Sequence, residues 1–256
     1  MSITLIKNKD IPLDIPKFLC DDSVVGDHMK EHSWTELLNN YGFLCCIGRP
    51  ASGKTSLAIA LITQKEPKIY RKTHHHIILM MPLNSIHSLK KNPFKCLPQE
   101  NIYGELNQET ITDVYNKIDK WSKDDEKTLV FIDDMTADLK SVAITLKKII
   151  YNRRHLKTNI IITGQSYVNL PLDCRKTITN LILFKPSKKE MEIIFDELIE
   201  SKKDKFEDIM RYAYDEKHNF LFVNIPTQRI FKNFDELIIK NDGEDLDENI
   251  SVVNNK

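Results

Sequence analysis

The segment IGRPASGKTS, residues 47–56, decides the fold class of this chain. Gly48 and Gly53 enclose four residues, and Lys54 and Thr55 follow directly. Glycines in this spacing let consecutive backbone N–H groups point at one phosphate group, and a helix that starts near Lys54 adds the positive end of its dipole. Lys54 then reaches the β and γ phosphates of ATP, and the Thr55 hydroxyl binds Mg²⁺. The sequence therefore predicts nucleotide binding by the loop residues Gly48, Pro50, Ala51, Ser52, Gly53, Lys54, Thr55 and Ser56.

The sequence on both sides of this loop supports the prediction. Residues 41–48, YGFLCCIG, form a short continuous apolar run that ends in glycine, which is typical of a strand buried on both faces. Residues 54–63, KTSLAIALIT, have helical periodicity and begin where the loop ends. A glycine turn followed by a surface lysine is the alternative, but the order strand, glycine loop and helix favours a phosphate loop.

Further strands and helices alternate along the chain. Strands are predicted at residues 74–82, 128–135, 159–166, 180–186 and 219–225, and helices at 110–122, 139–150 and 188–201. This alternation indicates a mostly parallel sheet with helices on both faces. We therefore predict an α/β fold of the P-loop NTPase type (RecA-like, ASCE class), a three-layer sandwich around a central, mostly parallel sheet.

Two adjacent acids end the strand in LVFIDDM, residues 129–135. A carboxylate at the carboxyl end of a buried strand is placed to hold Mg²⁺ through its hydration shell, and we assign this role to Asp133. Asp134 occupies the position where motors with an added strand between the loop and the acid strand usually carry a glutamate that polarises the attacking water. The aspartate side chain is one methylene shorter than that of the usual glutamate. The alternative is that both acids merely end a strand at a solvated turn.

A glutamine and several arginines are the remaining catalytic candidates. Gln165 follows a central strand, where its amide could contact both the γ-phosphate and the attacking water, so we interpret it as a sensor. Arg153, Arg154, His155 and Arg175 are the cations that we expect near this layer. One of them could stabilise transition-state charge in a neighbouring subunit's site, an effect of about 10³ to 10⁵ in rate. The alternative for each is an ordinary surface or ion-paired side chain.

Composition limits the other function classes. The 37 basic and 37 acidic residues give a formal net charge of zero, so only a local patch or an assembled ring could grip DNA. The densest basic run could meet a phosphate backbone or simply be a solvated helix end; it comprises Lys147, Lys148, Arg153, Arg154 and Lys157. Three adjacent histidines at 74–76 alternate faces on a strand and do not predict a metal site. The five cysteines indicate reduced thiols in a reducing compartment.

We predict three regions along the chain. Residues 1–40 form a lead-in that packs on the core and includes a short helix at 33–40, capped by Ser33 or Thr35. Residues 41–240 form the P-loop ATPase domain, and residues 241–256 form an acidic tail that we expect to be disordered. The chain has no uninterrupted apolar run near 18 residues, so no membrane span is predicted, and its start lacks the features of a secretory signal.

Taken in order, four segments resemble the genome-packaging ATPases of poxviruses, giant viruses and virophages, within the FtsK/HerA superfamily. The segments are GRPASGKTS, LVFIDDM, NRRHLKTNIIITGQSYVNLPLDCRKTITNLILFKPS and FLFVNIPTQRIFKNFDELI. The first two are shared with many P-loop proteins. The third segment is much more specific to these ATPases. The part that carries the resemblance runs from residues 154–155 through Gln165 to Arg175 and residues 184–185. The resemblance covers residues 41–239, most of the chain.

The resemblance implies an ATP-hydrolysing motor that assembles as a ring of five or six subunits and drives double-stranded DNA into a preformed capsid. By position, Lys54 and Thr55 match the nucleotide and magnesium residues, and Asp133 and Asp134 match the acidic pair. Gln165 matches the sensor, and Arg175 matches an arginine in the loop that follows it. Capsid or portal-vertex proteins are the implied partners, and the host cytoplasm or viral factory, or the virion itself, is the implied location.

Three rival functions stay open. A terminase motor would need a downstream nuclease with clustered acids, for which the chain is too short. A small-molecule kinase would need a lid over its acceptor substrate, and the sequence shows no arginine-rich lid between paired helices. A capsid-assembly scaffold that binds ATP without turnover differs from the motor only in activity, so DNA-stimulated phosphate release separates the two.

Overall fold

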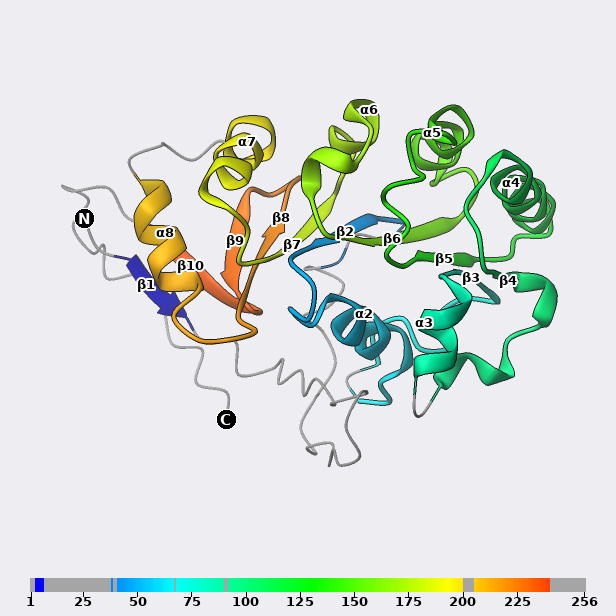
Figure 1. Ribbon diagram of the computed structural model, residues 1–256, viewed down its shortest axis with the longest axis horizontal. Helices are drawn as coiled ribbons and strands as arrows, with labels where there is room; N and C mark the ends of the chain where they lie inside the picture. The colour runs from blue at the N-terminus through cyan, green and yellow to red at the C-terminus, as the bar shows by residue number, and fades with distance from the viewer. Residues whose placement is uncertain are drawn as a thin grey trace, which may run out of the picture.

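The computed structural model describes residues 3–6, 38, 41–66, 68–89, 92–199 and 205–239. These residues form one ten-stranded sheet with helices on both faces (Figure 1). The strands are β1 Ile3–Ile6, β2 Phe43–Ile47, β3 His76–Met80, β4 Ile102–Tyr103, β5 Thr128–Ile132, β6 Thr158–Gly164, β7 Asn180–Phe184, β8 Phe220–Asn224, β9 Arg229–Lys232 and β10 Asp235–Ile239.

The helices cover the two faces of the sheet unequally. The α-helices are α2 Lys54–Thr63, α3 Leu83–Ser88, α4 Gln108–Lys123, α5 Ala143–Asn152, α6 Leu172–Arg175, α7 Lys188–Leu198 and α8 Phe206–Ala213, and the 3-10 helices are η1 Pro93–Cys96, η2 Gln99–Asn101 and η3 Tyr167–Asn169. In Figure 1, α2 and α3 lie on one face, and α4, α5, α6 and α7 lie on the other. The chain therefore forms the three-layer sandwich that the sequence predicts.

The strand order is β1-β10-β9-β8-β7-β2-β6-β5-β3-β4. The six strands from β7 to β4 pair in parallel, and β8, β9, β10 and β1 continue the sheet antiparallel. β6 separates the loop strand β2 from the acid strand β5, as in the P-loop class with an added strand. The predicted fold class, a P-loop NTPase with a mostly parallel central sheet, is confirmed.

Alternation along the central strands builds one apolar core on each side of the sheet. In β2, Cys45 and its odd-numbered neighbours face the cluster beneath α4, α5 and α7, while Leu44 and Cys46 face the cluster around α2. All five residues of β2 are buried, because a parallel strand covered on both faces has no solvent side. The cysteines of the described part of the chain are free; Cys45, Cys46 and Cys174 are buried and Cys96 is exposed.

Helix ends follow local capping chemistry. α4 begins at a capping box, in which the Asn107 side chain accepts from the Thr110 N–H and the Thr110 hydroxyl accepts from the Asn107 N–H.

The predicted helix over 139–150 is shorter at its start, because residues 136–142 form turns and α5 begins only at Ala143. Leu139 and Val142 are nevertheless fully buried, which is why their spacing resembles a helix in the sequence.

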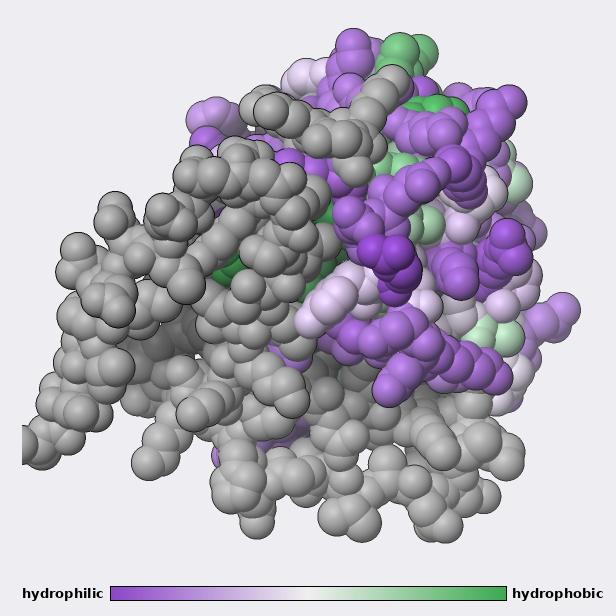
Figure 2. All heavy atoms as spheres, turned by 90° about the vertical axis from the view of Figure 1, so that its left-hand side faces the viewer, coloured by the Kyte–Doolittle hydropathy of each residue, from purple (hydrophilic) through white to green (hydrophobic). Residues whose placement is uncertain are grey.

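The sequence analysis did not predict four strands, which are the two-residue strand β4 and the strands β1, β9 and β10. β9 and β10 are joined by a two-residue turn at 233–234, and β1 pairs with β10 in an antiparallel register from Ile3 opposite Ile239. Figure 2 views the end of the molecule that carries β1 and α8, where the described side chains are mostly hydrophilic. The predicted helix at 33–40, apart from Leu38, and the predicted disordered tail at 241–256 lie outside the described residues, and the proposed domain boundaries stay a prediction.

The three adjacent histidines have separate partners. His76 stacks on Trp121 with ring centroids 3.8 Å apart and contacts Glu126, while the Nδ1 atom of His75 accepts from the Lys127 N–H. Within the described ranges, no group of three or more histidines, cysteines and acids could hold a metal ion. No helix in that same part of the chain is long and apolar enough to cross a membrane.

Candidate active site

The phosphate loop connects β2 to α2 at the carboxyl edge of the parallel strands. Gly53 precedes the first helical residue with φ at 106°, a left-handed conformation that favours glycine, and its carbonyl accepts from Leu57 N–H at 2.9 Å. Lys54 begins α2, and its side chain is buried with Nζ donating to the Arg49 carbonyl at 3.1 Å. The loop therefore curls around the lysine amino group, as a phosphate-binding loop requires.

Two contacts fix the loop against neighbouring strands. The Gly48 N–H donates to the Gly164 carbonyl at 3.1 Å, which joins the loop to the end of β6. The Gly48 Cα also lies so close to β7 that an added Cβ would be 2.6 Å from the Cβ of Phe184. Within the loop, the buried Ser52 hydroxyl has no hydrogen-bond partner among the described residues, so it is available to a ligand oxygen.

We expect Gly48→Ala to weaken nucleotide binding. The added methyl group would also lie 2.8 Å from the Ser52 Oγ, so the loop must shift away from Phe184. Overpacking of this kind costs about 1–3 kcal/mol, which corresponds to roughly a 5- to 150-fold higher Kd for ATP if the loop carries the strain. Titration of a fluorescent ATP analogue measures this Kd. An unchanged Kd in a folded variant would contradict the loop geometry described above.

Asp133 lies where the acid strand meets the loop. It is 2% exposed, and its Oδ1 accepts hydrogen bonds from the Thr55 hydroxyl at 2.8 Å and the Thr163 hydroxyl at 2.6 Å. Burial raises the pKa of the carboxyl, while the bonds from Thr163 and Thr55 act in the opposite direction. A carboxylate and a hydroxyl next to a phosphate loop are the oxygen donors that Mg²⁺ prefers, and a cation there would offset the burial of the charge. The residues therefore fit the predicted magnesium site of Thr55 and Asp133.

Asp134 and Gln165 lie next to one another at the ends of neighbouring strands β5 and β6. Asp134 has φ at 52°, its N–H donates to the Thr163 hydroxyl at 3.1 Å, and its carboxylate accepts from Gln165 Nε2 at 3.2 Å. Both side chains are exposed. The predicted closeness of Gln165 to the acids is confirmed, because β6 pairs directly with β5. The chemical roles of the two residues stay predictions.

Arg175 makes its ion pair and its aromatic contact with Glu197 and Tyr167, not with the phosphate loop. Its side chain is 13% exposed, pairs with Glu197 at 3.2 Å and lies over the Tyr167 ring, 5.1 Å from the centroid. The structure thus places Arg175 inside the subunit, between α6 and α7, and its proposed action on a neighbouring site stays a prediction.

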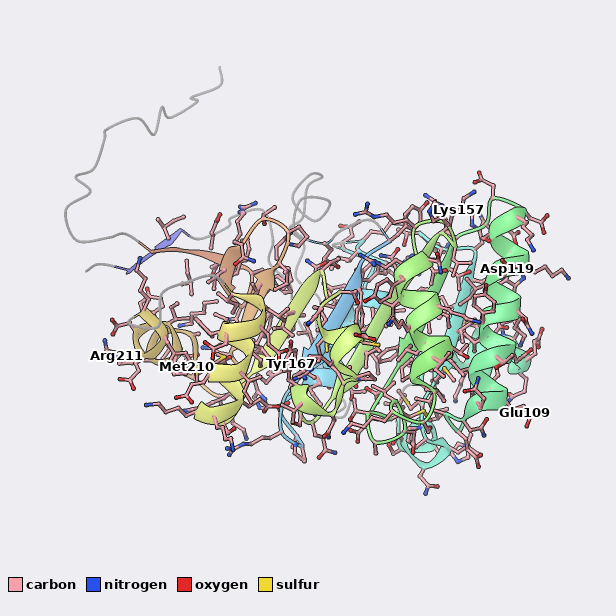
Figure 3. All side chains as sticks on the ribbon, turned by 90° about the horizontal axis from the view of Figure 1, so that it is seen from above. Glu109, Asp119, Lys157, Tyr167, Met210 and Arg211 are labelled. Carbon is pink, nitrogen blue, oxygen red and sulfur yellow. The ribbon has the colours of Figure 1, made fainter. Side chains whose placement is uncertain are left out.

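Arg154 is exposed in the turn between α5 and β6. That turn precedes the first residue of β6, whereas Gln165 follows the last, so the seven residues of the strand separate them by about 23 Å. Figure 3 shows Lys157 of the same turn at the edge of the sheet where Asp119 and the end of α4 lie. Our expectation that residues 153–155 lie near the catalytic layer is wrong for the chain's own site, because this turn is at the amino-terminal edge of the strands.

The basic run near this turn is largely paired within the chain. Lys147 contacts Asp173 at 2.5 Å, Lys157 contacts Asp125, and the Arg153 guanidinium donates to a backbone carbonyl of α5. Lys148 and Arg154 are exposed. This arrangement favours the interpretation of a solvated helix end over that of a dedicated DNA-binding strip.

A hollow of about 460 Å³ opens beside the phosphate loop. Phe184 and Pro186 give it an apolar wall, and loop residues Arg49 and Ser52 and the turn at 216–219 complete it. His218 in this turn has φ at 69°, and its Nδ1 lies 3.0 Å from the Ser52 carbonyl. The turn is thereby attached to the loop, although 166 residues separate the two in sequence.

Sequence reasoning overlooked three residues of the site. Arg49 stands inside the quoted loop, and Thr163 lies two residues before the sensor candidate, so both positions could have been suspected from the motifs. His218 carries no local signal, because only the packing of β7 and β8 brings its turn to the loop.

Three features define the P-loop NTPases with an added strand. They are a phosphate loop between a buried strand and a helix, an acid pair two strands away, and a glutamine that follows the strand between them. The family model described as Poxvirus A32 protein matches residues 29–255. The chain therefore belongs to this family, and the resemblance to the poxvirus-type packaging ATPases is confirmed. A comparison with curated proteins gives no match.

Solved structures with the same fold include two viral packaging enzymes. The genome-packaging NTPase B204 of Sulfolobus turreted icosahedral virus 2, in complex with ATP-gammaS, has a TM-score of 0.57 at 16% identity and covers 76% of this chain and 98% of its own. B204 of Sulfolobus turreted icosahedral virus, the DNA-packaging ATPase, has a TM-score of 0.55 at 18% identity with the same coverage. The cytoplasmic domain of the type VII secretion ATPase EccC of Thermomonospora curvata has a TM-score of 0.51 at 11% identity, and the match covers 77% of this chain and 23% of that one.

Proposed function

We propose that this protein hydrolyses ATP to move double-stranded DNA during the packaging of a viral genome. The observation that carries the proposal is the meeting of the loop lysine, the Thr55–Asp133 pair and the Asp134–Gln165 pair at the ends of three adjacent strands. Membership of the Poxvirus A32 protein family and the fold shared with B204 support the biological context.

Each polar group has a place in the proposed hydrolysis. Lys54 and the loop N–H groups bind the β and γ phosphates, and Thr55 and Asp133 hold Mg²⁺, which neutralises phosphate charge when bound. Asp134 accepts a proton from the attacking water or orients it, and Gln165, hydrogen-bonded to Asp134, fixes that water with respect to the γ-phosphate. Asp134 and Gln165 already contact one another, so the pair needs little rearrangement before the reaction.

The hollow beside the loop is the proposed place for the base and ribose. It adjoins the loop at Arg49 and Ser52, so a nucleotide whose phosphates lie in the loop extends into it. The apolar surfaces of Phe184 and Pro186 suit the face of a base, which is the usual composition of a small-molecule pocket.

A neighbouring subunit is the proposed source of the arginine that stabilises transition-state charge at the γ-phosphate. Among the described arginines that the sequence singles out, Arg175 is ion-paired internally and Arg154 lies at the opposite edge of the sheet. The exposure of Asp134 and Gln165 leaves the site open to a neighbour. We propose a ring of five or six subunits around the DNA, docked on capsid or portal-vertex proteins in the host cytoplasm or viral factory and associated with the virion.

Phosphate release by the purified full chain tests the proposal. We expect Mg²⁺-dependent ATP hydrolysis that increases several-fold when linear double-stranded DNA is added, and displacement of a DNA triplex in the same conditions. Sizing with nucleotide and DNA present should give a ring rather than a monomer. If hydrolysis is absent and Lys54→Ala causes no further loss, the translocase proposal is wrong and the nucleotide-binding scaffold takes its place.

A further inference from the structure

The segment that follows the sensor candidate is held by one glutamate of α7. Glu190 lies in the first turn of α7, and its Oε1 accepts from the Ser166 hydroxyl at 2.6 Å and from the Tyr167 N–H at 2.5 Å. Ser166 and Tyr167 are the two residues directly after Gln165. The carboxylate therefore fixes both the side chain and the backbone of the segment at the point where it leaves β6.

A second glutamate on the same helix holds the end of that segment. Glu197 follows Glu190 by seven residues, about two turns, so both project from one side of α7. Its Oε2 accepts from the Tyr167 hydroxyl at 2.8 Å, and its Oε1 pairs with Arg175. Tyr167 is fully buried and lies beside α7 in Figure 3. Burial and the bond to Glu197 raise the pKa of Tyr167, so its hydroxyl keeps its proton and donates.

Gln165 is thus held on both sides. Before it, the Gly164 carbonyl accepts from the Gly48 N–H of the phosphate loop; after it, Glu190 holds Ser166 and Tyr167. The Gln165 side chain itself is exposed, and its hydrogen bonds within the described part of the chain are to Asp134 alone. Its position relative to the loop is consequently set by its backbone, and the carboxyl-side restraint on that backbone comes from α7.

We propose that Glu190 is a positioning residue that sets the reach of Gln165 toward the γ-phosphate and the attacking water. This inference depends on the proposed ATP hydrolysis. It also gives α7 a part in the reaction, because a movement of α7 displaces the sensor without touching the nucleotide. Since a misplacement of about 1 Å costs on the order of 10²-fold in rate, a carboxylate remote from the nucleotide has a large effect through this geometry.

The test is a double-variant cycle on steady-state ATP hydrolysis by the full chain. We expect Glu190→Ala to lower kcat by roughly 10- to 100-fold, with KM and the Kd for an ATP analogue within about 2-fold of the wild type. In the Gln165→Ala background, Glu190→Ala should cause no further loss, because the residue acts only through the sensor. Glu190→Gln keeps an acceptor oxygen and should restore most of the activity.

Matched variants separate positioning from damage to the fold. Glu192→Ala removes an exposed glutamate that lies two residues after Glu190, about 200° around the helix from it, and should behave as the wild type. Ser166→Ala removes one of the two bonds to Glu190 and should give an intermediate kcat. An equal loss with and without Gln165, or a loss confined to KM, would overturn the positioning role. A wild-type chain without turnover would overturn the proposed function itself.

Discussion

Lys54→Ala is expected to lower ATP turnover by on the order of 10²- to 10³-fold, the usual cost of losing a preorganised charge at a transferring phosphoryl group. In the structure the Lys54 side chain is buried under the loop, and its Nζ is already directed at the loop interior by the Arg49 carbonyl. The amino group therefore needs no rearrangement to meet a phosphate, and alanine removes both the charge and the preorganisation. Phosphate release at saturating ATP measures the loss.

The fold should survive this substitution. Apart from the bond to the Arg49 carbonyl, Lys54 makes no ion pair within the described part of the chain, and α2 keeps its start because Gly53 sets the helix entry. We expect a midpoint of thermal unfolding within about 4 °C of the wild type. Lys68→Ala, at an exposed position after the same helix, is the matched control and should leave turnover unchanged. Retention of half the activity in Lys54→Ala would exclude this loop as the site of hydrolysis.

The central strands could be predicted because their signal is local. β2, β5, β6 and β7 are buried and mostly apolar, and three of them lead directly into a residue with a recognisable role: Gly48 after β2, Asp133 after β5 and Gln165 after β6. Once these strands are parallel, their carboxyl ends share one edge, so the contact between Asp134 and Gln165 follows from strand order. The site could therefore be predicted wherever a residue ends a central strand.

The other features depend on packing between distant segments. Arg175 is a surface cation by sequence, and only the position of Glu197 on α7 makes it an internal ion pair. The hollow combines the loop with residues 184–186 and 216–219, which no motif connects. β9 and β10 are short and contain lysine, aspartate and glutamate, so their apolar alternation is weak until β8 provides a partner edge. Positive φ at Asp134 likewise leaves no trace in composition.

Asp134→Asn should abolish most hydrolysis and leave nucleotide binding intact. The residue has φ at 52°, a conformation that asparagine adopts more readily than other non-glycine residues, and its N–H can still donate to the Thr163 hydroxyl. The exchange therefore removes the carboxylate charge without straining the turn, whereas alanine would add about 1–2 kcal/mol of backbone cost. Loss of a general base lowers kcat by about 10² to 10⁴. Single-turnover hydrolysis and ATP-analogue titration measure the two quantities separately.

The length of the side chain at this position gives the sharper test. Related motors usually carry a glutamate where this chain has Asp134, and the aspartate is one methylene shorter. We expect Gln165, whose Nε2 donates to this carboxylate, to compensate by fixing the water from the other side. Asp134→Glu should then retain more activity than Asp134→Asn but less than the wild type, and Asp138→Asn, an exposed acid four residues later, should change nothing. If Asp134→Asn kept the wild-type kcat, the base would have to be a different group, and Gln165 would lose the partner that justifies its role as sensor.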